Sequence, residues 1–328
     1  MDKMEQLKVF SKSIESMKST LDVHIVMPNN KEDKANKLIE EAYAEAQRLI
    51  QIISAWDENT TLYKVNKMAG IAPVKVCDEL FQLIKRGVYL SEITNGLFDI
   101  TFASIDKIWY FDKPLTEKPS AQKIQKSVRN INYKFIELNE ENQSIFINNK
   151  GTKIELGAIG KGFIATKMKE LLQKSGIKSG LISAGGDMTS WGQSIREGGF
   201  WNIGVADPNK EIKNIAWLPI KNESIATSGN YERFAIIDGK RYSHIIHPKT
   251  GYPVEGIKSV TVLSPDAELC DAIATTIFLK GVKKGLDFVN QFFDIRCFII
   301  DDNEKKHFSK NFKVEISYPN TANQKAVV

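Results

Sequence analysis

Two oxygen-bearing side chains stand four residues apart in the last third of the sequence. Asp271 and Thr275 lie within residues 266–280, a segment that we predict to be a helix. Because positions i and i+4 share one helix face, the carboxylate and the hydroxyl can reach the same point. Oxygen donors of this kind suit Mg²⁺, which keeps waters and substrate phosphates in its coordination shell. The alternative is an Asp near a helix N-terminus that interacts favourably with the helix dipole.

A second segment of chemical interest contains two histidines. His244 and His247 belong to the segment HIIHPKTG, which follows a predicted strand and forms a turn. A single His in such a place is more often structural than catalytic, and two at i and i+3 also suit a transition metal. His24 and His307 are remote in the sequence, so no third ligand for such a metal is evident.

Three glycine-containing turns could bind an anion. The segment GAIGKG, residues 157–162, is predicted between a strand and a helix, where free N–H groups suit phosphate and Lys161 adds positive charge. It matches neither common phosphate-binding fingerprint, so an ordinary strand–helix turn is the alternative. The segments AGGD (184–187) and SG (228–229) can also present backbone amides to an anion. Each also fits a plain turn, which Asp187 would orient or cap.

The spacing of apolar residues predicts the elements that position these groups. Alternating apolar residues predict a strand at 21–27. Apolar residues spaced by three and four predict a helix at 33–54, and a second helix at 78–93 ends before the Asn-Gly pair at 95–96. We predict a polar loop at 56–72.

The rest of the chain alternates between the two kinds of element. We predict strands at 144–148 and 152–156, a helix from the GAIGKG turn to residue 174 that is closed by Gly176, and a short strand LIS. Residues 201–264 are predicted to be mostly strands, with a hairpin at Asp238-Gly239. Two helices at 266–280 and 282–292 and a late strand, IRCFII, complete the pattern. No repeat of fixed period occurs, and the mixture predicts an α+β fold.

Composition places the chain among ordinary globular proteins. Its 328 residues include 45 Lys and Arg and 40 Asp and Glu, a formal net charge of +5 with no clustered basic block. This dispersed charge disfavours a nucleic-acid binder. No apolar run approaches the ~18 residues of a membrane span, and the polar N-terminus lacks a secretory signal. We therefore expect a soluble protein, cytoplasmic as the chain stands, with export or membrane anchorage as the alternative.

The three cysteines are Cys77, Cys270 and Cys297. They form no C-x-x-C pair, which excludes a zinc ribbon and a thioredoxin-type site. We interpret all three as small buried hydrophobic residues.

Taken together and in order, these segments resemble the FAD:protein FMN transferase family, ApbE. The resemblance runs from Met17 to about Gly281 and rests on six ordered motifs that are weak singly and specific together. In this sequence they read GLFDIT (96–101), ELGAIGKG (155–162), GGD (185–187), TSGNY (227–231), HIIHPKTG (244–251) and CDAIAT (270–275).

The resemblance implies a role for each matching residue. The residues expected to contact FAD are Met17, Trp56, Leu97, Phe98, Asp99, Glu155, Lys161 and Ile245. His244 is expected to be the catalytic base. The Ala158 carbonyl and the side chains of Asp271 and Thr275 are expected to bind Mg²⁺.

The sequence departs from the family pattern at four positions. Lys18 replaces Gly, Glu155 replaces Asp, Gly160 replaces Ala, and His247 replaces the Asp of HIIDP. The last change removes a negative charge near the expected metal site and puts in doubt any acid, base or ligand role there.

The resemblance also implies a fold and an activity. The fold would be an ApbE-like, T-fold-related α+β architecture of mostly antiparallel sheets with flanking helices. The whole chain, 1–328, would be one catalytic unit with an FAD cleft between two intimate lobes. The activity would be Mg²⁺-dependent transfer of FMN from FAD to a Thr or Ser of an acceptor protein carrying D-x-x-[ST]-G-A-[ST], with release of AMP. The alternatives are an FAD pyrophosphatase and a passive FAD-binding protein.

Overall fold

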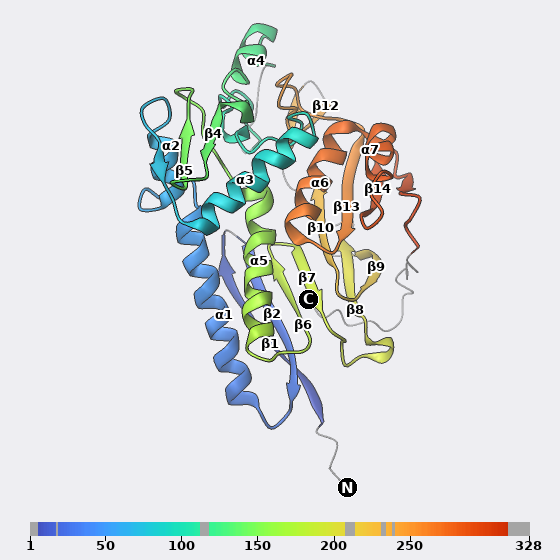
Figure 1. Cartoon of the computed structure of the whole chain (residues 1–328). Helices are drawn as coiled ribbons and strands as arrows, with labels where there is room; N and C mark the ends of the chain where they lie inside the picture. Colours follow the sequence, from blue (N-terminus) through green and yellow to red (C-terminus); the bar gives the residue numbers. More distant parts are fainter. Residues whose placement is uncertain are drawn as a thin grey trace.

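The core of the protein is an eight-stranded antiparallel sheet. The computed structural model describes residues 6–17, 19–111, 118–206, 214–230, 234–237 and 240–313. The strand order is β1-β2-β6-β7-β10-β13-β14-β15 (Figure 1). The strands are β1 (Leu7–Ser16), β2 (Ser19–Pro28), β6 (Gly180–Ala184), β7 (Asp187–Trp191), β10 (Ser224–Gly229), β13 (Ile257–Ser264), β14 (Arg296–Asp301) and β15 (Lys306–Phe308).

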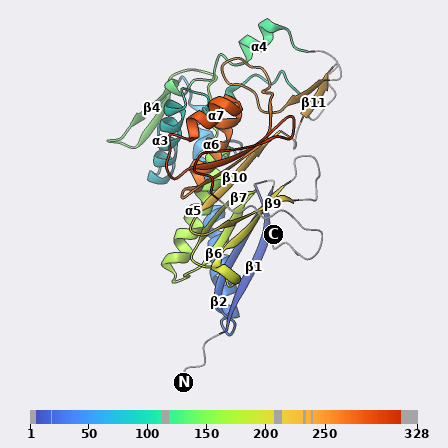
Figure 2. The same ribbon diagram turned by 90° about the vertical axis from the view of Figure 1, so that its right-hand side faces the viewer.

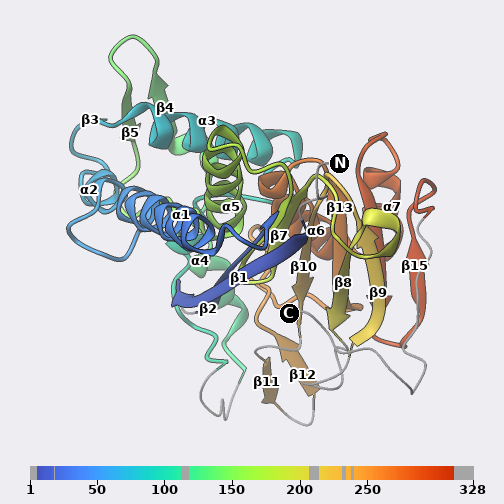
Figure 3. The same ribbon diagram turned by 90° about the horizontal axis from the view of Figure 1, so that it is seen from below.

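Helices cover one face of this sheet and a β-hairpin covers the other. The helices are α1 (Glu32–Ile53), α5 (Gly157–Lys174), α6 (Ala267–Lys280) and α7 (Val282–Val289). Figure 1 shows α1, α5 and α6 side by side in front of the strands. The hairpin of β8 (Trp201–Ala206) and β9 (Asn214–Ile220) packs on the opposite face, as the views from the side and from below show (Figures 2 and 3).

Smaller elements lie at the end of the helical layer. They include a three-stranded sheet of order β3-β5-β4 and a separate pair, β11-β12. Their bounds are α2 (Thr61–Lys67), β3 (Val74–Lys75), α3 (Asp78–Ile93), η1 (Phe102–Ser104), α4 (Ala121–Ser127), η2 (Tyr133–Phe135), β4 (Ile136–Asn139), β5 (Ser144–Ile147), β11 (Phe234–Ile237) and β12 (Lys240–Ser243). A further short helix, η3 (Glu197–Gly199), connects β7 to β8.

The period of the apolar residues explains which faces are buried. In β2, Leu21, Val23 and Ile25 are fully buried against the helices. In α1, the buried positions recur at three and four, so one stripe faces the sheet. The predicted α+β class is confirmed, as are the strand at 21–27 and the helices at 33–54 and 78–93.

Three predictions about local structure are wrong. The predicted loop at 56–72 contains α2, which Thr60 caps by accepting a hydrogen bond from the Tyr63 N–H. Residues 152–156 form no strand: the Ile154 N–H donates to the side chain of Asn66, and β5 pairs with β3 and β4. Cys77 is exposed, whereas Cys270 and Cys297 are buried as predicted. The predicted hairpin turn at 238–239, like Lys18, lies outside the described residues.

The GAIGKG segment forms the first six residues of α5 rather than a loop before it. Helices α5 and α6 pack closely at Gly162. A Cβ atom on Gly162 would lie 2.5 Å from the carbonyl carbon and oxygen of Ala267 and 2.7 Å from the backbone nitrogen of Glu268. Because these are backbone atoms, they cannot rotate away, and only glycine allows this approach.

We expect Gly162→Ala to lower the free energy of unfolding by about 1–3 kcal/mol, because the added methyl group overpacks the contact with α6. Urea denaturation measures this change. Gly160→Ala is the matched control in the same helix turn, since its methyl group would meet the flexible end of the Ile53 side chain at 2.9 Å and Cβ of Leu156 at an ordinary 3.9 Å, and no backbone atom. Equal stability of Gly162→Ala and the wild type would show that the helices tolerate a wider spacing.

Candidate active site

A pocket of about 190 Å³ gathers most of the residues expected from the resemblance. Its walls come from the segment after α3, the start of α5, the segment after β12, and α6. Eight of the predicted site residues line it: Leu97, Phe98, Asp99, Glu155, Ala158, His244, Ile245 and Thr275.

The chain segment after α3 is held in place by its own side chains. Thr94 donates a hydrogen bond from Oγ1 to the Leu90 carbonyl and accepts one from the Phe98 N–H. Asp99 accepts hydrogen bonds from the N–H and Oγ1 of Thr101 and from the N–H of Tyr133. Burial raises the pKa of Asp99 above its ordinary value, and these hydrogen bonds oppose the rise. The Asp99 carboxylate therefore organises the wall of the pocket.

A larger pocket of about 460 Å³ adjoins the first one. It lies between the β1–β2 turn, the end of α1 and the start of α5, and Met17, Trp56 and Lys161 line it. Glu155 lines both pockets, so they meet at this residue. Trp56 is 67% exposed, which leaves its ring accessible to a planar ligand.

Hydrogen bonds hold Glu155, which lines both pockets, between the segment after α3 and the start of α5. Its backbone N–H donates to the Ile100 carbonyl at 2.8 Å, and its Oε1 accepts a hydrogen bond from the Gly157 N–H at 2.9 Å. Burial raises the pKa of Glu155, while the Gly157 N–H and the charge of Lys161 oppose the rise. The carboxylate thus occupies the N-terminus of α5, where the helix dipole favours negative charge.

A charged centre of one half-buried lysine and two buried carboxylates lies beside the pockets. Lys161 Nζ lies 2.9 Å from Asp187 Oδ2 and 3.8 Å from Asp271 Oδ2. Burial and the neighbouring Asp187 carboxylate raise the pKa of Asp271 well above its ordinary value. Asp187 was predicted only to orient or cap a turn. Its position in the GGD motif was the available signal for this role, but only the fold brings it to Lys161.

The predicted metal donors are compatible with a divalent cation. Asp271 Oδ2 is buried and receives no hydrogen bond from the described residues. Thr275 Oγ1 lies 3.4 Å from Ser228 Oγ, and Ala158 lines the same pocket as Thr275. Among the described residues, no group of three or more His, Cys, Asp or Glu side chains is placed to hold a metal ion. One carboxylate, one hydroxyl and one backbone carbonyl suit Mg²⁺, which often binds only one or two carboxylates together with substrate phosphates.

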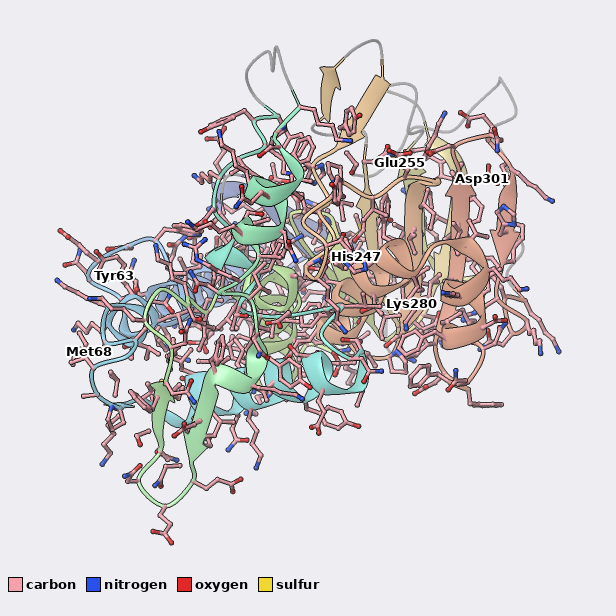
Figure 4. The ribbon with its side chains drawn as sticks, turned by 90° about the horizontal axis from the view of Figure 1, so that it is seen from above. Tyr63, Met68, His247, Glu255, Lys280 and Asp301 are labelled. Carbon is pink, nitrogen blue, oxygen red and sulfur yellow. The ribbon has the colours of Figure 1, made fainter. Side chains whose placement is uncertain are left out.

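His244 and His247 have different surroundings. The ring of the half-buried His244 lies on the wall of the smaller pocket, edge-on to Phe111 at 6.5 Å between ring centroids. In the view of Figure 4, the half-buried His247 lies between Tyr63 and Met68 on one side and Asp301 on the other.

His247 stabilises the turn that follows it. Its Nδ1 accepts a hydrogen bond from the Lys249 N–H at 3.2 Å. An Asp side chain commonly makes the same contact two residues along a turn. Burial, followed by the charge of Lys249, lowers the pKa of His247. The neutral imidazole therefore supplies the acceptor that an aspartate would supply, and the turn does not need the carboxylate.

Comparison with known proteins identifies the family. The model of the ApbE family matches residues 17–299. The chain belongs to the ApbE family. It is 31% identical over 276 residues to a FAD:protein FMN transferase of Klebsiella pneumoniae, covering 81% of this chain and 85% of that protein. It is 30% identical over 270 residues to a FAD:protein FMN transferase of Treponema pallidum, covering 77% and 74%.

Solved structures of the ApbE family share the fold. The crystal structure of the ApbE protein from Thermotoga maritima superposes with a TM-score of 0.82 at 28% identity, covering 93% of this chain and 98% of that one. The predicted ApbE-like architecture is thereby confirmed. In the part of the chain that the structure describes, no helix is both long and apolar enough to cross a membrane.

We expect Asp99→Asn to destabilise the protein by about 1–3 kcal/mol. Both carboxylate oxygens of Asp99 accept hydrogen bonds, and in Asn the NH₂ group would replace one of these acceptors with a donor. Chemical denaturation measures the loss. Asp294→Asn, at an exposed position, is the control and should change stability little. Equal stability of the two variants would contradict an organising role for Asp99.

Proposed function

We propose that this protein transfers FMN from FAD to a Thr or Ser hydroxyl of an acceptor protein and releases AMP. The observation that carries the proposal is the meeting of two pockets at Glu155, beside the centre formed by the half-buried Lys161 and the buried Asp187 and Asp271. Relatives named FAD:protein FMN transferase support it. We propose further that residues 1–328 act as one catalytic unit, with FAD between two intimate lobes.

The two pockets suit the two halves of a flavin dinucleotide. In our proposal, the flavin ring enters the larger pocket, where Met17 and the exposed face of Trp56 would pack against it. The smaller pocket, with Leu97, Phe98 and Ile245 on its walls, would take the adenosine half. The pyrophosphate would then pass the junction near Lys161, and the positive charge of Lys161 would offset the negative charge of the phosphates.

The residues that would hold Mg²⁺ are Asp271, Thr275 and the backbone carbonyl of Ala158. A bound divalent cation would supply positive charge that stabilises the charge developing on the phosphate oxygens. The buried Oδ2 of Asp271 receives no hydrogen bond from the part of the chain that the structure describes, which supports this assignment and argues against simple FAD storage, since storage needs no metal.

His244 would act as the base. It would accept the proton of the acceptor hydroxyl while the hydroxyl oxygen forms a bond to the FMN phosphorus and the bond from phosphorus to the AMP oxygen breaks. Imidazole is the side chain that most often accepts a proton as a general base in enzymes. The acceptor would carry D-x-x-[ST]-G-A-[ST]. This motif is absent from the present sequence, so self-flavinylation is not expected.

The direct test mixes the protein with FAD, Mg²⁺ and a peptide carrying the D-x-x-[ST]-G-A-[ST] motif. Intact-mass spectrometry should show the peptide gaining one FMN. An unmodified peptide with FAD converted to FMN and AMP would instead assign the pyrophosphatase activity. An unmodified peptide with intact FAD would assign passive binding.

We expect Asp271→Ala to lower the transfer rate by about 10²–10³-fold, since a lost metal ligand removes several kcal/mol of charge stabilisation. Excess EDTA should have a similar effect on the wild type, reversed by added Mg²⁺. The exposed Asp294→Ala is the control for folding and handling. Full activity of Asp271→Ala would exclude Asp271 as a ligand.

For His244→Ala we expect transfer to fall by about 10²–10⁴-fold, the usual contribution of a general base, while FAD still binds. Single-turnover transfer and flavin fluorescence measure the two quantities separately. His307→Ala, at the far edge of the sheet, is the matched control. Transfer at the wild-type rate in His244→Ala would remove this residue from the mechanism.

A further inference from the structure

The charged centre contains one ammonium group and two carboxylates. Lys161 Nζ lies 2.9 Å from the oxygen of Asp187 and 3.8 Å from that of Asp271. Asp187 is 2% exposed and Asp271 is 8% exposed, so water screens neither carboxylate well. In such surroundings charges interact strongly. An ammonium that pairs with Asp271 therefore competes with any cation that binds there.

The β6–β7 turn places the buried carboxylate of Asp187 against the ammonium group of Lys161. Gly185 has a φ of +62°, and its N–H donates to the Thr20 carbonyl at 2.9 Å, which fixes the turn against β2. A Cβ on Gly185 would lie 3.3 Å from Cδ of Lys161 and from Ser19. Asp187 follows as the first residue of β7, paired with Ala184. The turn thus packs along the Lys161 side chain and brings a buried carboxylate to its end.

These contacts lead to a role for Asp187 that the family motif alone does not specify. We propose that Asp187 is a positioning residue: it holds the Lys161 ammonium at 2.9 Å and so leaves Asp271, at 3.8 Å, available to Mg²⁺. The proposal rests on the metal site of the proposed function. It assigns Asp187 no contact with the metal or with FAD.

Two consequences distinguish this role from a direct effect of the Asp187 charge on the metal. When Asp187 is neutralised, Lys161 should move toward Asp271 and oppose cation binding. When Lys161 is neutralised as well, most of that opposition should disappear. Removal of Asp187 should therefore cost more metal affinity with Lys161 present than with Lys161 replaced by Gln, a coupling that a double-mutant cycle measures.

The experiment titrates Mn²⁺, as a probe of the Mg²⁺ site, into the full-length protein and follows the free-Mn²⁺ electron paramagnetic resonance signal. Asp187→Asn should weaken Mn²⁺ binding by about tenfold or more, the change equivalent to one pKa unit of charge interaction. Asp187→Glu should restore much of the binding, because it keeps the carboxylate. Lys161→Gln alone should bind Mn²⁺ more tightly than the wild type.

The outcomes separate the two proposals. If Asp187→Asn costs the same Mn²⁺ affinity in the wild-type and Lys161→Gln backgrounds, Asp187 acts on the metal directly and the positioning role is overturned. If the wild type binds no Mn²⁺, the metal site of the proposed function fails and the role of Asp187 fails with it. If Asp187→Asn does not fold, the Lys161→Gln variant provides the test. If Lys161→Gln binds Mn²⁺ no more tightly than the wild type does, the proposal is overturned.

Discussion

The close contact of α5 with α6 at Gly162 is the constraint on which the rest of the site depends. Because a hydrogen atom replaces a side chain there, the backbone of Ala267 approaches α5 to a distance that no Cβ would allow. The contact brings one end of α5, with Ala158 and Lys161, beside the face of α6 that carries Asp271 and Thr275. A wider spacing would separate Lys161 from Asp271.

Charge balance is the second requirement of this arrangement. Two buried carboxylates near each other are unfavourable, and Lys161 offsets part of their repulsion. The same ammonium would compete with a metal for Asp271. In our proposal Asp187 resolves this conflict, because it lies closer to Lys161 than Asp271 does and follows a turn that packs along the lysine stem.

Periodicity predicted the long elements well because their buried stripes repeat over several turns or pairs of residues. It failed where a contact between distant segments decides the structure. Residues 152–156 alternate like a strand, yet the Ile154 backbone donates its hydrogen bond to Asn66, 88 residues away. The short helix α2 lacks a long apolar pattern, and Thr60 supports it through a local cap that was not recognised. Cys77 lies at the surface directly before α3, and the apolar character of cysteine alone does not predict that exposure.

The sequence by itself determined the α+β class, the family and the i, i+4 pairing of Asp271 with Thr275, because these depend on residue order and local spacing. Only the tertiary structure decided that Glu155 joins two pockets and that Asp187 reaches Lys161. It also decided that His247 stabilises a turn through Nδ1. The reason is physical: the first two arrangements depend on how closely separate helices and strands pack, and the third on a side-chain orientation that spacing leaves open.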